Sequence, residues 1–104
     1  MYKLVLHKNL NAERWQKFSR QQQLLMIANE LNRAANWIKK NDTYEVNNCY
    51  ERALELLDLT IAMNYRKNRM RELLIAREVL AKLYIDEQKN EKINKLLKKV
   101  IIKL

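Results

Sequence analysis

The chain of 104 residues contains no glycine and no proline. Glycine adopts positive φ angles without steric cost, and the tight turns between β-strands depend on such angles. A fold rich in strands is therefore hard to build from this chain, whereas helices joined by loops of Asn and Asp need few such positions. The sequence predicts an all-α fold.

The first long helix is predicted from a capping pattern followed by helical spacing. Ser19 and Gln22 match a capping box, in which each side chain binds a backbone N–H at the start of a helix. Apolar residues then recur at intervals of four and three up to about Lys40, at Leu24, Ala28, Leu31, Ala35 and Ile38. The preceding segment, 11–18, is predicted to be a short helix or an extension of the long one.

A second long helix is predicted over residues 43–62, after the break at Asn41-Asp42-Thr43. Its apolar stripe is unusually broad, which places the helix at the centre of a bundle or at a subunit interface. The sequence-based hypothesis is an interface in a homodimer, formed by Tyr50, Leu54, Leu57, Leu59 and Ile61.

Two further helices complete the prediction. One runs from Met70 to about Ile85, with Leu73, Leu74, Leu80, Leu83 and Tyr84 facing inward, and one follows a break near 86–90. The last helix has an inward face of Ile93, Leu96, Leu97, Val100, Ile101 and Leu104. We expect a single domain over 1–104: a small antiparallel bundle of about four helices, three long and one shorter at the C-terminus. In the rival arrangement residues 43–85 form one continuous helix, leaving three. Residues 1–10 are expected to form an arm or a frayed tail.

The composition limits which classes of function the chain can have. The chain has one cysteine, no apolar run long enough for a transmembrane helix and no secretory pattern at its start, so we expect a cytoplasmic protein with no membrane association. Phosphate-binding loops and nucleophile elbows need glycine, and histidine-based metal sites need more than the single His7. We therefore expect no enzyme activity, no catalytic or metal site and no cofactor.

Two resemblances extend this picture. Glu55-Leu56-Leu57-Asp58 resembles the Glu-x-x-Asp half of the magnesium motif of all-α nucleoside triphosphate pyrophosphatases, and with Glu51 it lines one stripe of the helix 43–62. The second carboxylate group of that motif has no counterpart, since the preceding helix offers only Glu30. The stretch 34–56, with the run Tyr-Glu-Arg-Ala-Leu-Glu-Leu, resembles one hairpin of a tetratricopeptide repeat. No second copy follows at the period of 34 residues that such arrays use.

The charge is strongly positive, with a formal net charge of +9. Tyr65, Arg66, Lys67, Arg69 and Arg71 form a basic segment beside the predicted start of a helix, where the helix dipole repels cations. Such a segment is a candidate contact for nucleic acid or another polyanion. The leading functional hypothesis is a helical protein-interaction or structural module that self-associates, and the alternative is a basic protein that binds polyanions.

Overall fold

The computed structural model describes residues 12–64 and 69–104, and over these ranges it contains five helices and no strand. The helices are α1 (Ala12–Lys17), α2 (Arg20–Lys39), α3 (Thr43–Ala62), α4 (Met70–Ile85) and α5 (Glu91–Ile102). The all-α prediction is confirmed, including the short helix near the N-terminus and the breaks near 41–43 and 86–90. The predicted arm at 1–10 and the greater part of the connection at 64–68 lie outside the described residues.

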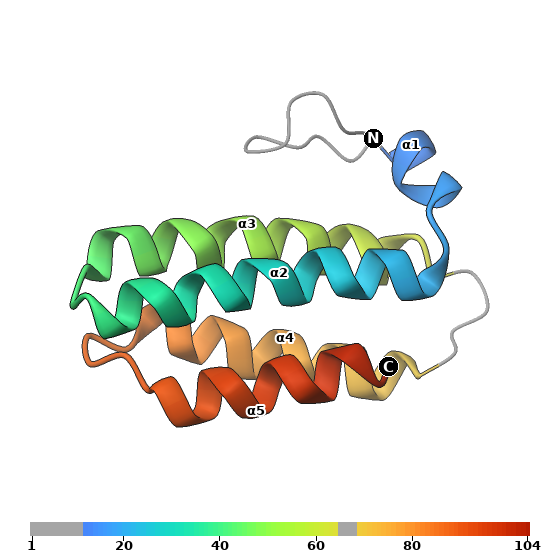
Figure 1. Cartoon of the computed structure of the whole chain (residues 1–104). Helices are drawn as coiled ribbons and strands as arrows, with labels where there is room; N and C mark the ends of the chain where they lie inside the picture. Colours follow the sequence, from blue (N-terminus) through green and yellow to red (C-terminus); the bar gives the residue numbers. More distant parts are fainter. Residues whose placement is uncertain (1–11, 65–68) are drawn as a thin grey trace.

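The four longer helices form an antiparallel bundle of two layers (Figure 1). Helices α2 and α3 form one layer and α4 and α5 the other, with α2 packed on α5 and α3 packed on α4. Because α3 and α4 lie side by side, the rival arrangement with one continuous helix over 43–85 is wrong. Helices α4 and α5 contact each other less than either contacts its partner in the other layer.

Polar side chains define where three of the helices begin. Ser19 accepts a hydrogen bond from the backbone N–H of Gln22 at 3.1 Å, and the Gln22 side chain accepts one from the Ser19 N–H at 2.8 Å. This is the predicted capping box. Asp42 caps α3 and Asn90 caps α5 in the same way, by accepting from the N–H three residues further on.

The chain turns from α2 into α3 without glycine because an asparagine takes its place. Asn41 has a φ of 56°, in the left-handed region, which Asn tolerates better than most residues. Its backbone N–H donates to the carbonyl of Ile38, which closes the last turn of α2. The loop chemistry expected from the composition is thus present at this break.

Helix α1 is held against α3 by Trp15. The indole is fully buried, and its Nε1 donates to the Thr60 hydroxyl at 3.0 Å. That hydroxyl in turn donates to the carbonyl of Leu56 at 2.8 Å. Trp15 is therefore a packing residue whose one polar atom has a partner.

Helix α3 is the centre of the molecule, because it packs against α1, α2 and α4. Of the predicted interface residues, Tyr50, Leu57 and Leu59 are fully buried inside the chain, and Leu54 and Ile61 are partly buried against the same core. The broad apolar stripe of α3 is thus covered within one molecule. Among the five, only Leu54 and Ile61 retain surface that a second chain could reach.

The sequence-based inward faces of α4 and α5 are partly wrong. Leu97 and Ile101 are buried as expected, but four residues predicted to face the core are exposed, namely Leu74, Ile93, Leu96 and Val100. The physical reason is that the apolar stripe of α5 is wider than the surface that α2 and α4 cover. The uncovered part of that stripe lies at the surface between α4 and α5.

Candidate functional site

The uncovered apolar surface forms a groove of about 260 Å³ between α4 and α5. Leu96 is 58 % exposed, and Ile75 and Val100 are each 50 % exposed. Isolated exposed apolar residues are normal on a protein surface, but a contiguous group marks a surface for binding. The groove is lined by Glu72, Ile75, Ala76 and Val79 of α4 and by Ile93, Leu96, Leu97 and Val100 of α5.

Helical spacing in both helices builds this groove. On α5 its exposed wall is Ile93, Leu96 and Val100, residues three and four apart, which lie on one face of a helix. On α4 the corresponding wall contains Ile75 and Val79. Each side of the groove, residues 93–100 on α5 and 72–79 on α4, spans about two helical turns, or roughly 10 Å. The buried residues Ala76 and Leu97 form the floor between them.

Polar contacts on the far sides of α4 and α5 tie each helix to the other layer. Asn94 of α5 is buried; its amide nitrogen donates to the carbonyl of Leu31 at 3.0 Å, and its amide oxygen accepts from the Tyr50 hydroxyl at 2.8 Å. The Arg77 guanidinium of α4 pairs with Asp58 of α3. These contacts hold α5 toward α2 and α3, and α4 toward α3, while the side facing the groove stays open.

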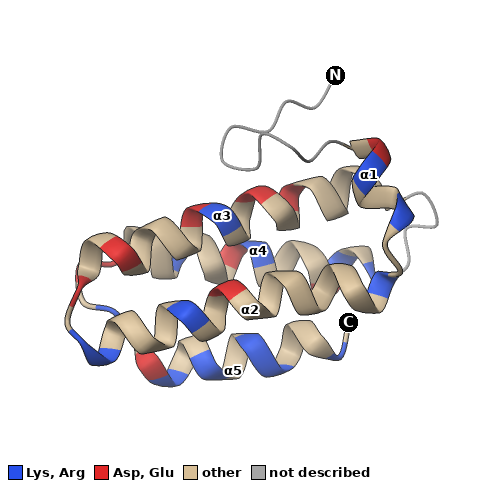
Figure 2. Cartoon of the chain, turned by 45° about the horizontal axis from the view of Figure 1, so that its top comes forward, with Lys and Arg blue, Asp and Glu red and all other residues tan. Residues whose placement is uncertain are grey.

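Cations line the outer edge of the groove on α5. Lys92, Lys99 and Lys103 are exposed and lie three or four residues from Leu96 or Val100, so they are neighbours of the apolar wall on the helix surface. Figure 2 shows the lysines, in blue, recurring along α5. None of these three lysines forms an ion pair with an acidic side chain in the described part of the chain.

The edge on α4 is mixed in charge. Arg71 and Lys82 are exposed on the side of α4 that borders the groove, and Glu78 is exposed beside them. Glu72 lines the groove itself. The groove is therefore apolar within, uniformly basic along α5 and mixed along α4.

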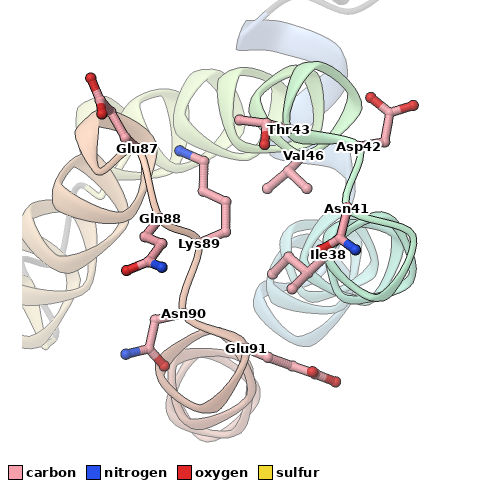
Figure 3. Close-up of a pocket in the computed structure, with 10 residues that line it drawn as sticks. All are labelled: Ile38, Asn41, Asp42, Thr43, Val46, Glu87, Gln88, Lys89, Asn90 and Glu91. Atoms are coloured by element: carbon pink, nitrogen blue, oxygen red, sulfur yellow. The ribbon is translucent and has the colours of Figure 1, made fainter.

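A second hollow, of about 490 Å³, lies where the loop between α2 and α3 meets the loop between α4 and α5 (Figure 3). Its polar groups already serve the fold: Asp42 and Asn90 cap helices, and the Lys89 ammonium donates to the carbonyls of Leu83, Tyr84 and Asp86. In Figure 3 the carboxylates of Asp42, Glu87 and Glu91 point away from the hollow. Asp42, Lys89 and Asn90 are therefore already engaged in contacts that hold the fold.

The buried thiol of Cys49 lies beside a charged cluster between α2 and α3. Glu30, 5 % exposed, pairs with Arg52 at 3.0 Å and with Arg33 at 3.2 Å, and the Arg52 guanidinium also contacts the Cys49 sulfur. Burial raises the pKa of Cys49, more than the nearby Arg52 lowers it. A covered, protonated thiol is a poor nucleophile, so this cluster is a structural ion pair within the fold.

The two other groups of candidate residues from the sequence, the acidic stripe and the basic segment, lie in different parts of the chain. Within the acidic stripe of α3, Asp58 pairs with Arg77, and no group of three or more metal-ligating side chains occurs among residues 12–64 and 69–104. Of the basic segment, Tyr65, Arg66 and Lys67 lie outside the described residues. Arg69 and Arg71 are exposed at the start of α4, and Arg69 has a left-handed φ of 55° with no side-chain cap for the helix.

Comparison of the chain with protein-family models, with curated proteins and with solved structures finds no match. The geometry of the described residues is therefore the basis for a functional proposal. In that part of the chain, no helix is both long and apolar enough to pass through a membrane. The groove between α4 and α5 is the feature that sequence reasoning missed, because the α5 residues that line it were assigned to the core and the α4 residues that line it were not singled out.

Proposed function

We propose that this protein is a non-catalytic helical binding module that holds an amphipathic helix of a protein partner in the groove between α4 and α5. The observation that carries the proposal is the contiguous exposed apolar wall of α4 and α5. A groove between two antiparallel helices suits a third helix, whose apolar residues at i, i+3 or i+4, and i+7 match walls of two turns. A cytoplasmic location is part of the proposal, since a single cysteine allows no intrachain disulfide.

A small-molecule ligand fits this groove less well than a helix. Pockets for small molecules have volumes of about 300–1,000 Å³ and contain a few polar groups that orient the ligand. This groove is smaller, at about 260 Å³, and Glu72 is its only polar lining residue among those described. A bound helix needs no such orienting groups, because the two walls align its axis with the groove.

The apolar residues of α3, from which a homodimer is predicted, belong to the core of the bundle. The broad stripe of α3 suggested a dimer, and that stripe is covered by α1, α2 and α4 of the same chain. Helix α3 is therefore not proposed as an interface between chains.

The test uses the full chain and a labelled helical peptide of about 14 residues, or four turns, with an apolar face and neutral Gln edges. Fluorescence anisotropy is expected to show saturable binding, and Leu96→Gln or Val100→Gln is expected to weaken it at least about tenfold. Leu74→Gln is the matched control, because Leu74 is an equally exposed residue of α4 outside the groove. Absence of saturable binding, or an equal loss in the Leu74 variant, would contradict the proposal.

A second candidate function is polyanion binding at the end of the bundle where α2 and α4 begin (Figure 1). Its support is a concentration of cations: burial lowers the pKa of Arg20, and the positive charge of Arg69 lowers it further. Changing Arg66, Lys67, Arg69 and Arg71 together to Gln is expected to abolish binding to duplex DNA that weakens steeply with salt. Unchanged DNA binding by that variant would remove this candidate.

A further inference from the structure

We infer that the helix held in the groove belongs to a different protein and carries acidic residues along the edge that faces α5. The inference rests on the proposed function and specifies the chemistry of the partner. The single occupant inferred is a partner helix, because the exposed lysines beside the groove complement acidic side chains and the groove has the shape for a helix.

The row of lysines on α5 supplies the first part of the case. Lys92, Lys99 and Lys103 follow one another at intervals of seven and four, so they form one line of about 17 Å along the helix. The line runs directly beside Leu96 and Val100, the most exposed apolar residues on the α5 side of the groove. A helix seated between the walls would therefore place its own edge residues opposite these ammonium groups.

The opposite edge makes the expected partner asymmetric. On α4, the basic residues Arg71 and Lys82 lie on either side of the acidic residues Glu72 and Glu78 in the sequence. These charges of both signs give little net preference for an acidic or a basic edge. The preference for acidic residues is therefore confined to the edge of the bound helix that faces α5. Because reversing the helix end to end would turn that edge toward α4, the preference also determines the N-to-C direction of the bound helix.

A second copy of this chain does not satisfy these requirements. Its net charge is +9, so a second copy would bring a further excess of cations to a groove whose α5 edge is already basic. Its one acidic segment is residues 43–62, with four acidic residues against one basic residue. That segment is α3, whose apolar stripe is buried at the centre of the bundle and cannot be offered to a neighbour without unfolding.

A lipid surface is also a poorer fit than a helix. The exposed apolar residues line the walls of a groove, whereas a membrane surface is matched by a protruding apolar face with aromatic anchors. The two tryptophans are at positions 15 and 37, outside α4 and α5. Glu72 lines the groove and would have to enter the lipid with its neighbours.

The experiment compares three labelled peptides with one common apolar face and with Glu, Gln or Lys along one edge. At low salt the Glu peptide is expected to bind about five- to tenfold tighter than the Gln peptide, the factor that three exposed ion pairs supply, and the Lys peptide is expected to bind weakest. The advantage of the Glu peptide should shrink as salt is raised from about 50 to about 500 mM, because the charges are exposed.

Two matched variants locate the effect. Lys92, Lys99 and Lys103 changed together to Gln should remove the advantage of the Glu peptide and leave affinity for the Gln peptide unchanged. The control changes Lys17, Lys40 and Lys95 to Gln, three exposed lysines outside the groove, and lowers the net charge by the same amount. That control should retain most of the advantage.

The possible failures are distinguishable. Equal affinity for the Glu and Gln peptides overturns the inference and leaves the proposed function standing. Failure of all three peptides to bind removes both. A concentration-dependent dimer in sedimentation that Leu96→Gln dissociates, or binding to anionic lipid vesicles that Leu96→Gln abolishes while no peptide binds, identifies another occupant and also overturns the inference.

Discussion

Asn94 is the buried residue that connects three helices through one side chain. It sits on α5, donates to the Leu31 carbonyl of α2 and accepts from the Tyr50 hydroxyl of α3. A buried amide is favourable only when its hydrogen bonds are made, and here both the oxygen and the nitrogen have a partner. This contact sets the position of α5 along its axis, and with it the position of the groove wall.

Replacing Asn94 should be more costly than replacing its partner. Asn94→Ala leaves the Tyr50 hydroxyl buried without an acceptor and opens a small cavity, so we expect a loss of about 2–3 kcal/mol in the free energy of unfolding. Tyr50→Phe removes the hydroxyl itself, and we expect a loss of about 1–2 kcal/mol. Urea denaturation of both variants and of the double variant checks this. If the single losses simply add in the double variant, the two side chains do not interact.

The same tyrosine makes stability depend on pH in the alkaline range. Burial raises the pKa of Tyr50 above its ordinary value near 10, and the neighbouring Cys49 adds to the shift. The unfolded chain then loses the phenolic proton at a lower pH than the native protein does. Stability is therefore fully present below about pH 10 and falls as pH rises above it, by up to about 1.4 kcal/mol per pH unit.

Comparing wild type with Tyr50→Phe isolates this effect. The raised pKa of Cys49 acts in the same direction and the pKa of Lys89, lowered by burial, acts in the opposite direction, but both groups are present in both proteins. The free energy of unfolding should fall more steeply in wild type between about pH 10 and 11. Parallel curves for the two proteins would show that the Tyr50 hydroxyl is accessible to solvent.

The C-terminal end of α4 binds the ammonium group of Lys89, which lies in the following loop. The Lys89 ammonium lies within 2.9 Å of the Leu83 and Tyr84 carbonyls and within 2.6 Å of the Asp86 carbonyl. These include carbonyls at the helix C-terminus, where a positive charge is favourable. Lys89 also lies 5.7 Å from the centre of the Tyr50 ring. It therefore joins the α4–α5 loop to the core.

Lys89→Met should loosen the end of α4. The substitution keeps an unbranched side chain that is one atom shorter, and it removes three charge-assisted hydrogen bonds, one of them exposed. We expect a loss of about 1–2 kcal/mol in the free energy of unfolding and faster amide hydrogen exchange in the last turn of α4. Lys95→Met is the control, because Lys95 is an exposed lysine of the neighbouring helix. An equal loss in the control would show that Lys89 acts only through the net charge.

Element boundaries were predictable where the signal is local. Ser19 and Gln22 lie three residues apart, and Asp42 is next to the helix that it caps, so the sequence alone predicts these starts. The role of Lys89 was not predictable, because its partners include carbonyls five and six residues away that become accessible only after α4 has ended and the chain has turned. No property of lysine distinguishes this one from its exposed neighbours.

At the scale of the whole molecule, helical spacing predicted which residues are apolar but not how much of each stripe another helix covers. Leu96 and Leu97 are adjacent, both apolar and both compatible with the inward face of α5. Leu97 is 5 % exposed and Leu96 is 58 % exposed. The difference depends on how far α4 and α5 lean apart, which is determined by contacts with the other layer. The candidate site therefore required the structure.

These two leucines give a matched test of the packing. Leu97→Ala should cost about 2–5 kcal/mol, as expected for a buried leucine, and Leu96→Ala should cost less than about 1 kcal/mol. Thermal or urea unfolding of the two variants measures the difference. Similar large losses for both would mean that the groove is covered in solution, either by a second chain or by another segment.

The burial of Cys49 makes the reactivity of its thiol a measure of how often the helical bundle opens. It is the single cysteine of the chain, it is fully buried between α2 and α3, and its pKa is raised, so a thiol reagent can modify it only in molecules whose helices have separated. The rate of alkylation therefore measures the fraction of molecules in which the helices have separated, and it needs no added label. A helix bound only to the closed bundle would slow that rate in proportion to its occupancy, so the same thiol can report both folding and binding.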